Sequence, residues 1–138
     1  MKIDISSLSQ LDTFAQSCSQ ELMPGDVIFL HGDLGSGKTT FTQLLLKHLN
    51  YQGRVKSPTY AIYECYQLKS FSLIHMDLYR LSSPEELYYL GIDEIFDAAN
   101  VVIIEWPEKG RGVLPAANKT IHFELHNAQE RSINIEIT

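Results

Sequence analysis

Cysteine, positive charge and long apolar runs are all scarce in this sequence, and each scarcity excludes or disfavours a class of protein. Cys18 and Cys65 are the two cysteines among 138 residues, and their spacing fits neither a zinc site nor a redox motif. We therefore expect two reduced, buried thiols. The 17 acidic residues outnumber the 11 basic ones and give a formal net charge of -6, which disfavours tight unaided binding to nucleic acid.

The apolar segments are too short to cross a bilayer, and the initial stretch MKIDISSLSQ lacks the apolar core of a signal peptide. We therefore expect a cytoplasmic protein without a membrane segment. A hydrophobic content of 44% with 20% charged residues is typical of a globular domain. The length fits a single domain over residues 1–138 with one hydrophobic core.

Hydrophobic periodicity predicts helices and strands in a mixed order. Alternating or continuous apolar patterns predict strands over 1–5, 26–31, 60–68, 71–77, 101–106, 119–127 and 131–138. Helical spacing and capping residues predict helices over 8–22, over 38–49, and from Ser82 or Ser83 to Gly91. The segments 60–68 and 71–77 are separated by two residues only, so we expect them to form a β-hairpin.

The stretch HGDLGSGKTTF matches the phosphate-binding pattern GxxxxGK[ST] and lies between a predicted strand and a predicted helix. Glycines let successive backbone N–H groups converge on an anion, and the helix that follows adds its positive end. Lys38 is expected to reach the β- and γ-phosphates, and the Thr39 hydroxyl to coordinate Mg²⁺. The residues expected to contact nucleotide here are Asp33, Leu34, Gly35, Ser36, Gly37, Lys38, Thr39 and Thr40.

This loop, together with the order of elements, predicts the fold class. We expect an α/β, P-loop NTPase-like three-layer domain, in which helices flank a mixed parallel and antiparallel sheet.

Two acidic residues at predicted strand ends are candidates for the catalytic chemistry. Glu105 closes the apolar run VVIIE, and Asp77 closes SLIHMD. Either acid alone could be a solvated strand end, but a P-loop upstream favours function for both. We expect Glu105 to hold Mg²⁺, directly or through water. Asp77 is expected to orient or deprotonate the attacking water, or to share the metal.

Three further residues are candidates for sensing the nucleotide. Thr59, in the segment KSPTY, is placed to report the γ-phosphate, although an ordinary turn fits the same segment. Trp106 and Arg131 could stack on a base or pack beside it, and Trp106 fits a core position equally well. Guanine-specific proteins carry an NKxD element, but Asn118 and Lys119 are followed by isoleucine where the acid is needed, so we expect ATP and ADP rather than GTP.

The histidines form no cluster with metal-ligand spacing, and each is predicted to be an ordinary strand or helix residue. They are His31, His48, His75, His122 and His126.

Four segments together resemble one family. GDLGSGKTTF, VKSPTYAIYE, HMDLYRLSSPEELYYLGIDEIF and IIEWPEKGRGVLP are similar to the signatures of the TsaE (YjeE) family, in which a small bacterial ATPase serves tRNA threonylcarbamoyl-adenosine synthesis. The resemblance implies a feeble ATPase that uses ATP and Mg²⁺ and is stimulated by a heterodimer of TsaD-like and TsaB-like subunits. That heterodimer modifies tRNAs reading codons that begin with A, and the ATPase resets it between turnovers. The resemblance therefore implies that tRNA is met only indirectly.

Two other functions fit the P-loop. A small-molecule P-loop kinase would usually carry an arginine-bearing lid, and the four arginines of this chain are spread along it without an insertion long enough for one. A nucleotide-sensing module that never hydrolyses ATP would not need Asp77 and Glu105.

Overall fold

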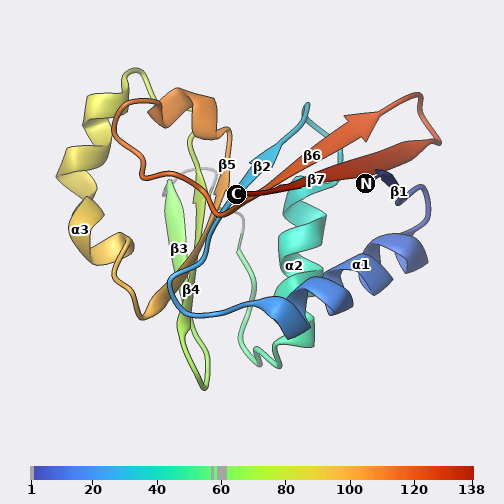
Figure 1. Cartoon of the computed structure of the whole chain (residues 1–138), viewed down its shortest axis with the longest axis horizontal. Helices are drawn as coiled ribbons and strands as arrows, with labels where there is room; N and C mark the ends of the chain where they lie inside the picture. Colours follow the sequence, from blue (N-terminus) through green and yellow to red (C-terminus); the bar gives the residue numbers. More distant parts are fainter. Residues whose placement is uncertain (1, 57, 59–61) are drawn as a thin grey trace.

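The computed structural model describes residues 2–56, 58 and 62–138, and it is organised around one seven-stranded sheet (Figure 1). The strands follow one another across the sheet in the order β1-β7-β6-β2-β5-β4-β3. Their bounds are β1 Lys2–Asp4, β2 Val27–His31, β3 Tyr63–Gln67, β4 Ser72–Asp77, β5 Asn100–Glu105, β6 Lys119–Leu125 and β7 Arg131–Ile137.

The four central strands are parallel and the outer pairs are antiparallel. β2 pairs in parallel with both β5 and β6, and β5 pairs in parallel with β4. The pairs β3–β4, β6–β7 and β1–β7 are antiparallel. β5 has a continuous apolar sequence because both its faces are covered, as is usual for central parallel strands. The predicted mixed sheet and the predicted hairpin of β3 and β4 are confirmed.

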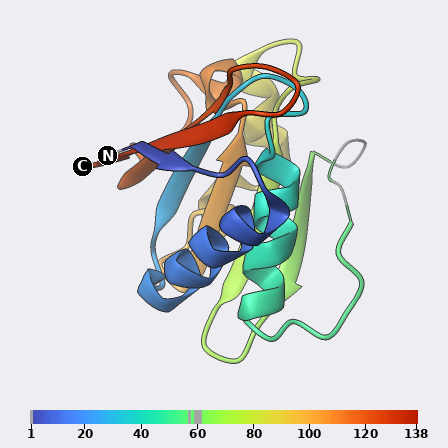
Figure 2. The ribbon, with the colours of Figure 1, turned by 90° about the vertical axis from the view of Figure 1, so that its right-hand side faces the viewer.

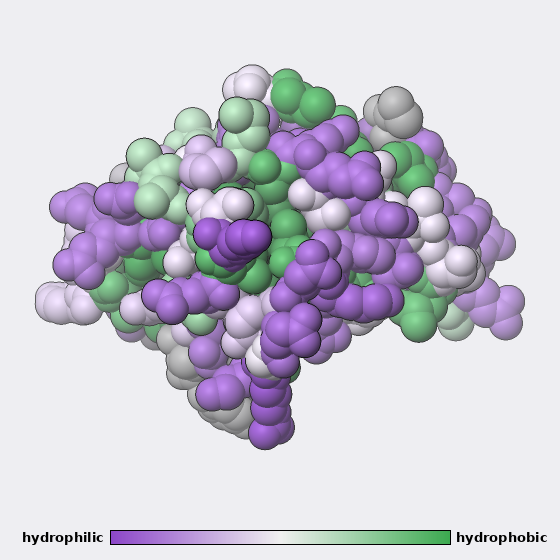
Figure 3. Space-filling view, turned by 90° about the horizontal axis from the view of Figure 1, so that it is seen from below, coloured by the Kyte–Doolittle hydropathy of each residue, from purple (hydrophilic) through white to green (hydrophobic). Residues whose placement is uncertain are grey.

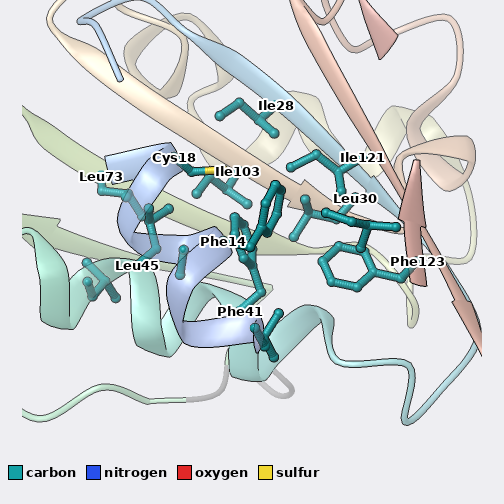
Figure 4. Packing of buried hydrophobic residues seen from close by; sticks show 14 of the residues in the cluster. Phe14, Cys18, Ile28, Leu30, Phe41, Leu45, Leu73, Ile103, Ile121 and Phe123 are labelled. Atoms are coloured by element: carbon teal, nitrogen blue, oxygen red, sulfur yellow. The ribbon is translucent and has the colours of Figure 1, made fainter. Parts of the chain in front are cut away.

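Two helices cover one face of the sheet: α1 (Leu8–Glu21) and α2 (Lys38–His48) (Figure 2). Ser7 begins α1 as the N-cap residue of a capping box with Gln10, which satisfies backbone N–H groups that the first helical turn leaves free. Phe14 of α1 and Phe41 of α2 meet between the helices and the strands, with ring centroids 5.4 Å apart (Figure 4). The packing of these two rings holds α2 against the sheet and so sets the direction in which its N-terminus points.

Short helical turns cover the opposite face over β4 and β5, which completes three layers (Figure 1). They are the 3₁₀ helix η1 (Pro84–Leu90), the helix α3 (Ile92–Ile95) and the 3₁₀ helix η2 (Pro107–Gly110). The predicted helix after Ser83 is present as η1, and Gly91 ends it in the left-handed conformation with φ 74°. α3 and η2 are additional to the predicted elements.

Three expectations need correction or restriction. The strand predicted over 101–106 ends at Glu105, because Trp106 takes a left-handed conformation with φ 56° before Pro107. Cys18 is buried as expected, but Cys65 is exposed on the edge strand β3. The predicted start of the hairpin at residues 60 and 61 lies outside the described residues.

The exposed surface is largely hydrophilic, as the composition predicts. Hydrophilic side chains cover most of the face seen in Figure 3, with apolar side chains showing between them. Among residues 2–56, 58 and 62–138, no helix is long and apolar enough to cross a membrane.

Candidate nucleotide site

The loop HGDLGSGKTTF connects the end of β2 to the start of α2, at the carboxyl ends of the parallel strands, where ligands bind in open α/β sheets. Gly35 and Gly37 have φ of 79° and 114°, a region that side chains rarely adopt. Gly32 has no room for a side chain, because a Cβ atom there would lie 2.7 Å from Ser36 Oγ and 2.8 Å from the Phe123 carbonyl oxygen. The glycines are therefore required by the path of the loop.

The sheet register brings the two predicted acids together. In the parallel pair β4–β5, Asp77 lies opposite Glu105, and Glu105 also lies opposite Leu30 near the end of β2. A cavity of about 510 Å³ opens at this edge. It is lined by Leu34, Gly35, Gly37, Lys38, Thr39, Thr40, Asp77, Tyr79, Arg80, Glu105, Trp106 and Arg131.

Lys38 is held at the base of the cavity and is only 4% exposed. Its Nζ donates a hydrogen bond to the Gly32 carbonyl oxygen and lies 4.0 Å from the centroid of the Trp106 ring. Burial lowers the pKa of Lys38, and the carboxylates of Glu105 and Asp77 partly oppose that shift. An anionic group entering the cavity would add the negative charge that favours the ammonium form.

Glu105 is 3% exposed and accepts two hydrogen bonds at the same oxygen. Thr39 Oγ1 lies 3.1 Å from Glu105 Oε2, and His75 Nε2 lies 2.6 Å from it. Mg²⁺ prefers hydroxyl, carboxylate and phosphate oxygens, so the Thr39 hydroxyl beside the Glu105 carboxylate suits this ion. Asp77 supplies a further carboxylate to the same cavity.

Asp77 differs from Glu105 in its surroundings. It is half-buried, and its backbone-facing oxygen Oδ1 accepts a hydrogen bond of 3.0 Å from the Tyr79 N–H. Burial raises the pKa of Asp77, and the nearby Glu105 charge raises it further, whereas the Tyr79 bond opposes the shift. A carboxylate with a raised pKa is a better proton acceptor, which is the property that a general base needs.

Aromatic and basic residues form the rim of the cavity. The rings of Trp106 and Tyr79 lie 5.0 Å apart, and Arg131 reaches the cavity from the start of β7. Tyr79 and Arg80 were not predicted as site residues, although they lie two and three residues after Asp77 and so are close to the same edge of the sheet. Base stacking by Trp106 and Arg131 stays a prediction.

Two described residues of the predicted site, Ser36 and Asp33, are absent from the cavity lining. Ser36 is 1% exposed and its hydroxyl lies close to Gly32, and Asp33 is exposed. Thr59 lies outside the described residues, so its predicted role as a γ-phosphate sensor stays a prediction.

His75 was predicted to be an ordinary strand residue, and the structure instead places it against the site. It is 1% exposed, and its Nε2 atom contacts the Glu105 carboxylate. A signal was available, because His75 and Asp77 are two residues apart in a strand and therefore point to the same face of the sheet. Neither residue alone shows that Glu105 of another strand lies beside that face.

Asn118 also has a position that bears on the choice of nucleotide. Its Oδ1 accepts a hydrogen bond of 2.6 Å from the Val27 N–H, and its Nδ2 donates to Asp26 Oδ1 at 2.9 Å. Asn118 thus joins the start of β2 to the start of β6, at the end of these parallel strands away from the P-loop. This position fits the expectation that Asn118 and Lys119 do not form a guanine-recognition element.

Comparisons with known proteins agree on one family. Residues 5–133 match the family model described as "Threonylcarbamoyl adenosine biosynthesis protein TsaE". The tRNA threonylcarbamoyladenosine biosynthesis protein TsaE of Haemophilus influenzae is 44% identical over 101 residues, which are 73% of this chain and 64% of that protein. The protein of the same name from Rickettsia typhi is 38% identical over 133 residues, or 96% of this chain and 92% of that protein. The crystal structure of Bacillus subtilis YdiB superimposes with a TM-score of 0.77 and 30% identity over 96% of this chain and 82% of that one.

Proposed function

Because this chain belongs to the TsaE family of tRNA threonylcarbamoyladenosine biosynthesis proteins, we propose that its part in that pathway is to bind and hydrolyse ATP. The observation that carries the proposal is the meeting of Lys38, Thr39, Glu105 and Asp77 in one cavity at the phosphate loop. These side chains come from three separate elements, and together they supply the functional groups that phosphoryl transfer to water requires.

The residues divide the work as follows. The backbone N–H groups of the loop and the N-terminus of α2 hold the phosphates, and Lys38 neutralises charge on the β- and γ-phosphates. Thr39 and Glu105 are the residues that would hold Mg²⁺, with Asp77 as a further oxygen donor. When bound, the ion neutralises charge that builds up on the phosphate oxygens.

Asp77 is the proposed general base. A water molecule that attacks the γ-phosphorus must lose a proton, and Asp77 lines the cavity at the carboxyl end of β4. The raised pKa of Asp77 favours this role over that of Glu105, whose carboxylate is already engaged by Thr39 and His75.

The proposed partners are TsaD-like and TsaB-like subunits that transfer the threonylcarbamoyl group. A formal net charge of -6 gives the chain little attraction to a polyphosphate backbone, so we assign tRNA contact to the partners. ATP binding and hydrolysis by this chain would then reset the transfer complex between turnovers.

The test is ATP hydrolysis by the purified chain, alone and with the heterodimer added. We expect a low rate alone, a sharp rise with the heterodimer, and loss of both in Lys38→Ala. A high rate that ignores the heterodimer would overturn the partner-dependent function and favour a kinase or a self-sufficient ATPase. ATP binding without hydrolysis under every condition would favour a nucleotide-sensing module.

A further inference from the structure

His75 is a buried polar residue that the proposed chemistry does not itself require. Its side chain is 1% exposed, and its Nδ1 atom has no hydrogen-bond partner among the described residues. The Nε2 atom, in contrast, lies 2.6 Å from Glu105 Oε2. Burying an imidazole with one nitrogen unsatisfied costs free energy of folding. The one hydrogen bond to Glu105 is therefore the interaction that accounts for the position of His75.

The sheet explains why His75 reaches Glu105. His75 lies opposite Ile103 in the parallel register, and Asp77 lies opposite Glu105. Side chains two residues apart in a strand share a face of the sheet, and paired residues of neighbouring strands do so too. His75, Asp77 and their partners Ile103 and Glu105 therefore all point toward the side that α2 covers. Leu73, two residues before His75, is fully buried in the core on this face. His75 therefore stands between the apolar core and the cavity, below the Glu105 carboxylate.

Glu105 Oε2 is the shared acceptor of a short chain of hydrogen bonds. His75 Nε2 donates from the core side, and Thr39 Oγ1 donates from the first turn of α2 at 3.1 Å. A Thr39 hydroxyl that gives its hydrogen to Glu105 keeps its lone pairs for a cation. The orientation of the Thr39 hydroxyl thus depends on the position of the Glu105 carboxylate, and that position depends on His75.

We propose that His75 is a positioning residue that fixes the Glu105 carboxylate, and through it the Thr39 hydroxyl, for binding of Mg²⁺ with ATP. His75 contacts neither nucleotide nor ion in this role. Groups that orient metal ligands from behind affect metal binding strongly, because a ligand that is free to rotate loses the geometry the ion needs. The inference rests on the proposed ATP-binding function.

Two amide variants separate positioning from general packing. His75→Gln places an N–H₂ group about where Nε2 lies, so it keeps the bond to Glu105. His75→Asn is one methylene shorter and places the same group where Nδ1 lies, out of reach of Glu105. His48→Asn is the matched control, because His48 Nε2 bonds to a carboxylate in the same way, Asp12 Oδ1 at 2.9 Å, at the far end of α2.

The measurement is ATP affinity by calorimetry, in EDTA and across a Mg²⁺ titration, with the melting temperature of each variant. We expect His75→Asn to bind ATP like the wild type in EDTA but to need about 10- to 100-fold more Mg²⁺ for the same gain in affinity. His75→Gln and His48→Asn should keep the wild-type Mg²⁺ requirement. A purely structural role would lower the melting temperature and leave the Mg²⁺ requirement of the folded protein unchanged.

The outcomes separate this inference from the proposed function. If the wild type binds ATP with Mg²⁺ and His75→Asn has the same Mg²⁺ requirement, the positioning role is wrong and the ATPase proposal stands. If the wild type shows no Mg²⁺-dependent ATP binding, the proposed function fails and the inference falls with it. Should His75→Asn not fold, His75→Gln decides: a wild-type Mg²⁺ requirement supports the donor role, and a changed requirement overturns it.

Discussion

Replacing Asp77 with Asn should lower the rate of ATP turnover and raise the stability of the fold. The change keeps the size of the side chain and its acceptor oxygen for the Tyr79 N–H, but it removes the negative charge and the ability to accept a proton. If Asp77 is the general base, ATP turnover should fall about 10²- to 10⁴-fold, or about 3–5 kcal/mol in activation free energy. ATP affinity should be kept or improved, because a negative charge near the phosphates is lost.

The same variant should be more stable than the wild type at neutral pH. Burial raises the pKa of Asp77 in the folded state above that in the unfolded chain, so its charged form is less favourable in the fold. The stability that this group contributes is present below the unfolded pKa and is lost as pH rises through the folded pKa. Asp77→Asn removes that loss, so its advantage in melting temperature should be present at neutral pH and should shrink on acidification.

The assays are steady-state ATP hydrolysis in the presence of the heterodimer and thermal melting across the acid range. Asp93→Asn is the control, because Asp93 is an exposed acid on α3 outside the cavity. Wild-type turnover in Asp77→Asn would refute the base assignment. A melting temperature below that of the wild type at neutral pH would refute the argument from burial.

The remaining predictions concern the loop and the first helix. Trp106 is the one tryptophan of the chain and lies 4.0 Å from Lys38 Nζ, so ATP binding should change tryptophan fluorescence in the wild type but not in Lys38→Ala. Gly32→Ala should lower stability by about 1–3 kcal/mol in urea unfolding, because the added Cβ would press on Ser36 Oγ, and unchanged stability would contradict the close approach. Ser7→Ala should cost about 1 kcal/mol by loss of the α1 N-cap bond, measured in the same way.

The fold could be predicted from the sequence where one local signal was strong. Apolar runs such as VVIIE and the alternation in the last two strands located those elements, because burial on two faces and on one face leave different patterns. The strand predicted through Trp106 was one residue too long, because an apolar side chain does not reveal a left-handed backbone. α3 was missed because a four-residue helix is too short to show periodicity.

The candidate site, like the fold, could be predicted where one continuous segment carries the signal. The P-loop is one continuous segment, so its residues were identified together. Asp77 and Glu105 were found as strand ends, and their pairing depends on a register that joins distant segments. The contact of His75 with Glu105 depends on that same register, and the sequence of either strand alone does not contain it.

The central position of β2 has a consequence for how the chain folds during its synthesis. β2 and the phosphate loop leave the ribosome early, but the partners of β2 on both sides, β5 and β6, come from the second half of the chain. The bond between Val27 and Asn118 spans 91 residues. Pairings over such distances form late, since the intervening loop must first be closed. A growing chain therefore contains its phosphate-loop residues before Glu105 has been synthesised, so the proposed nucleotide site can be complete only after the later strands have joined the sheet.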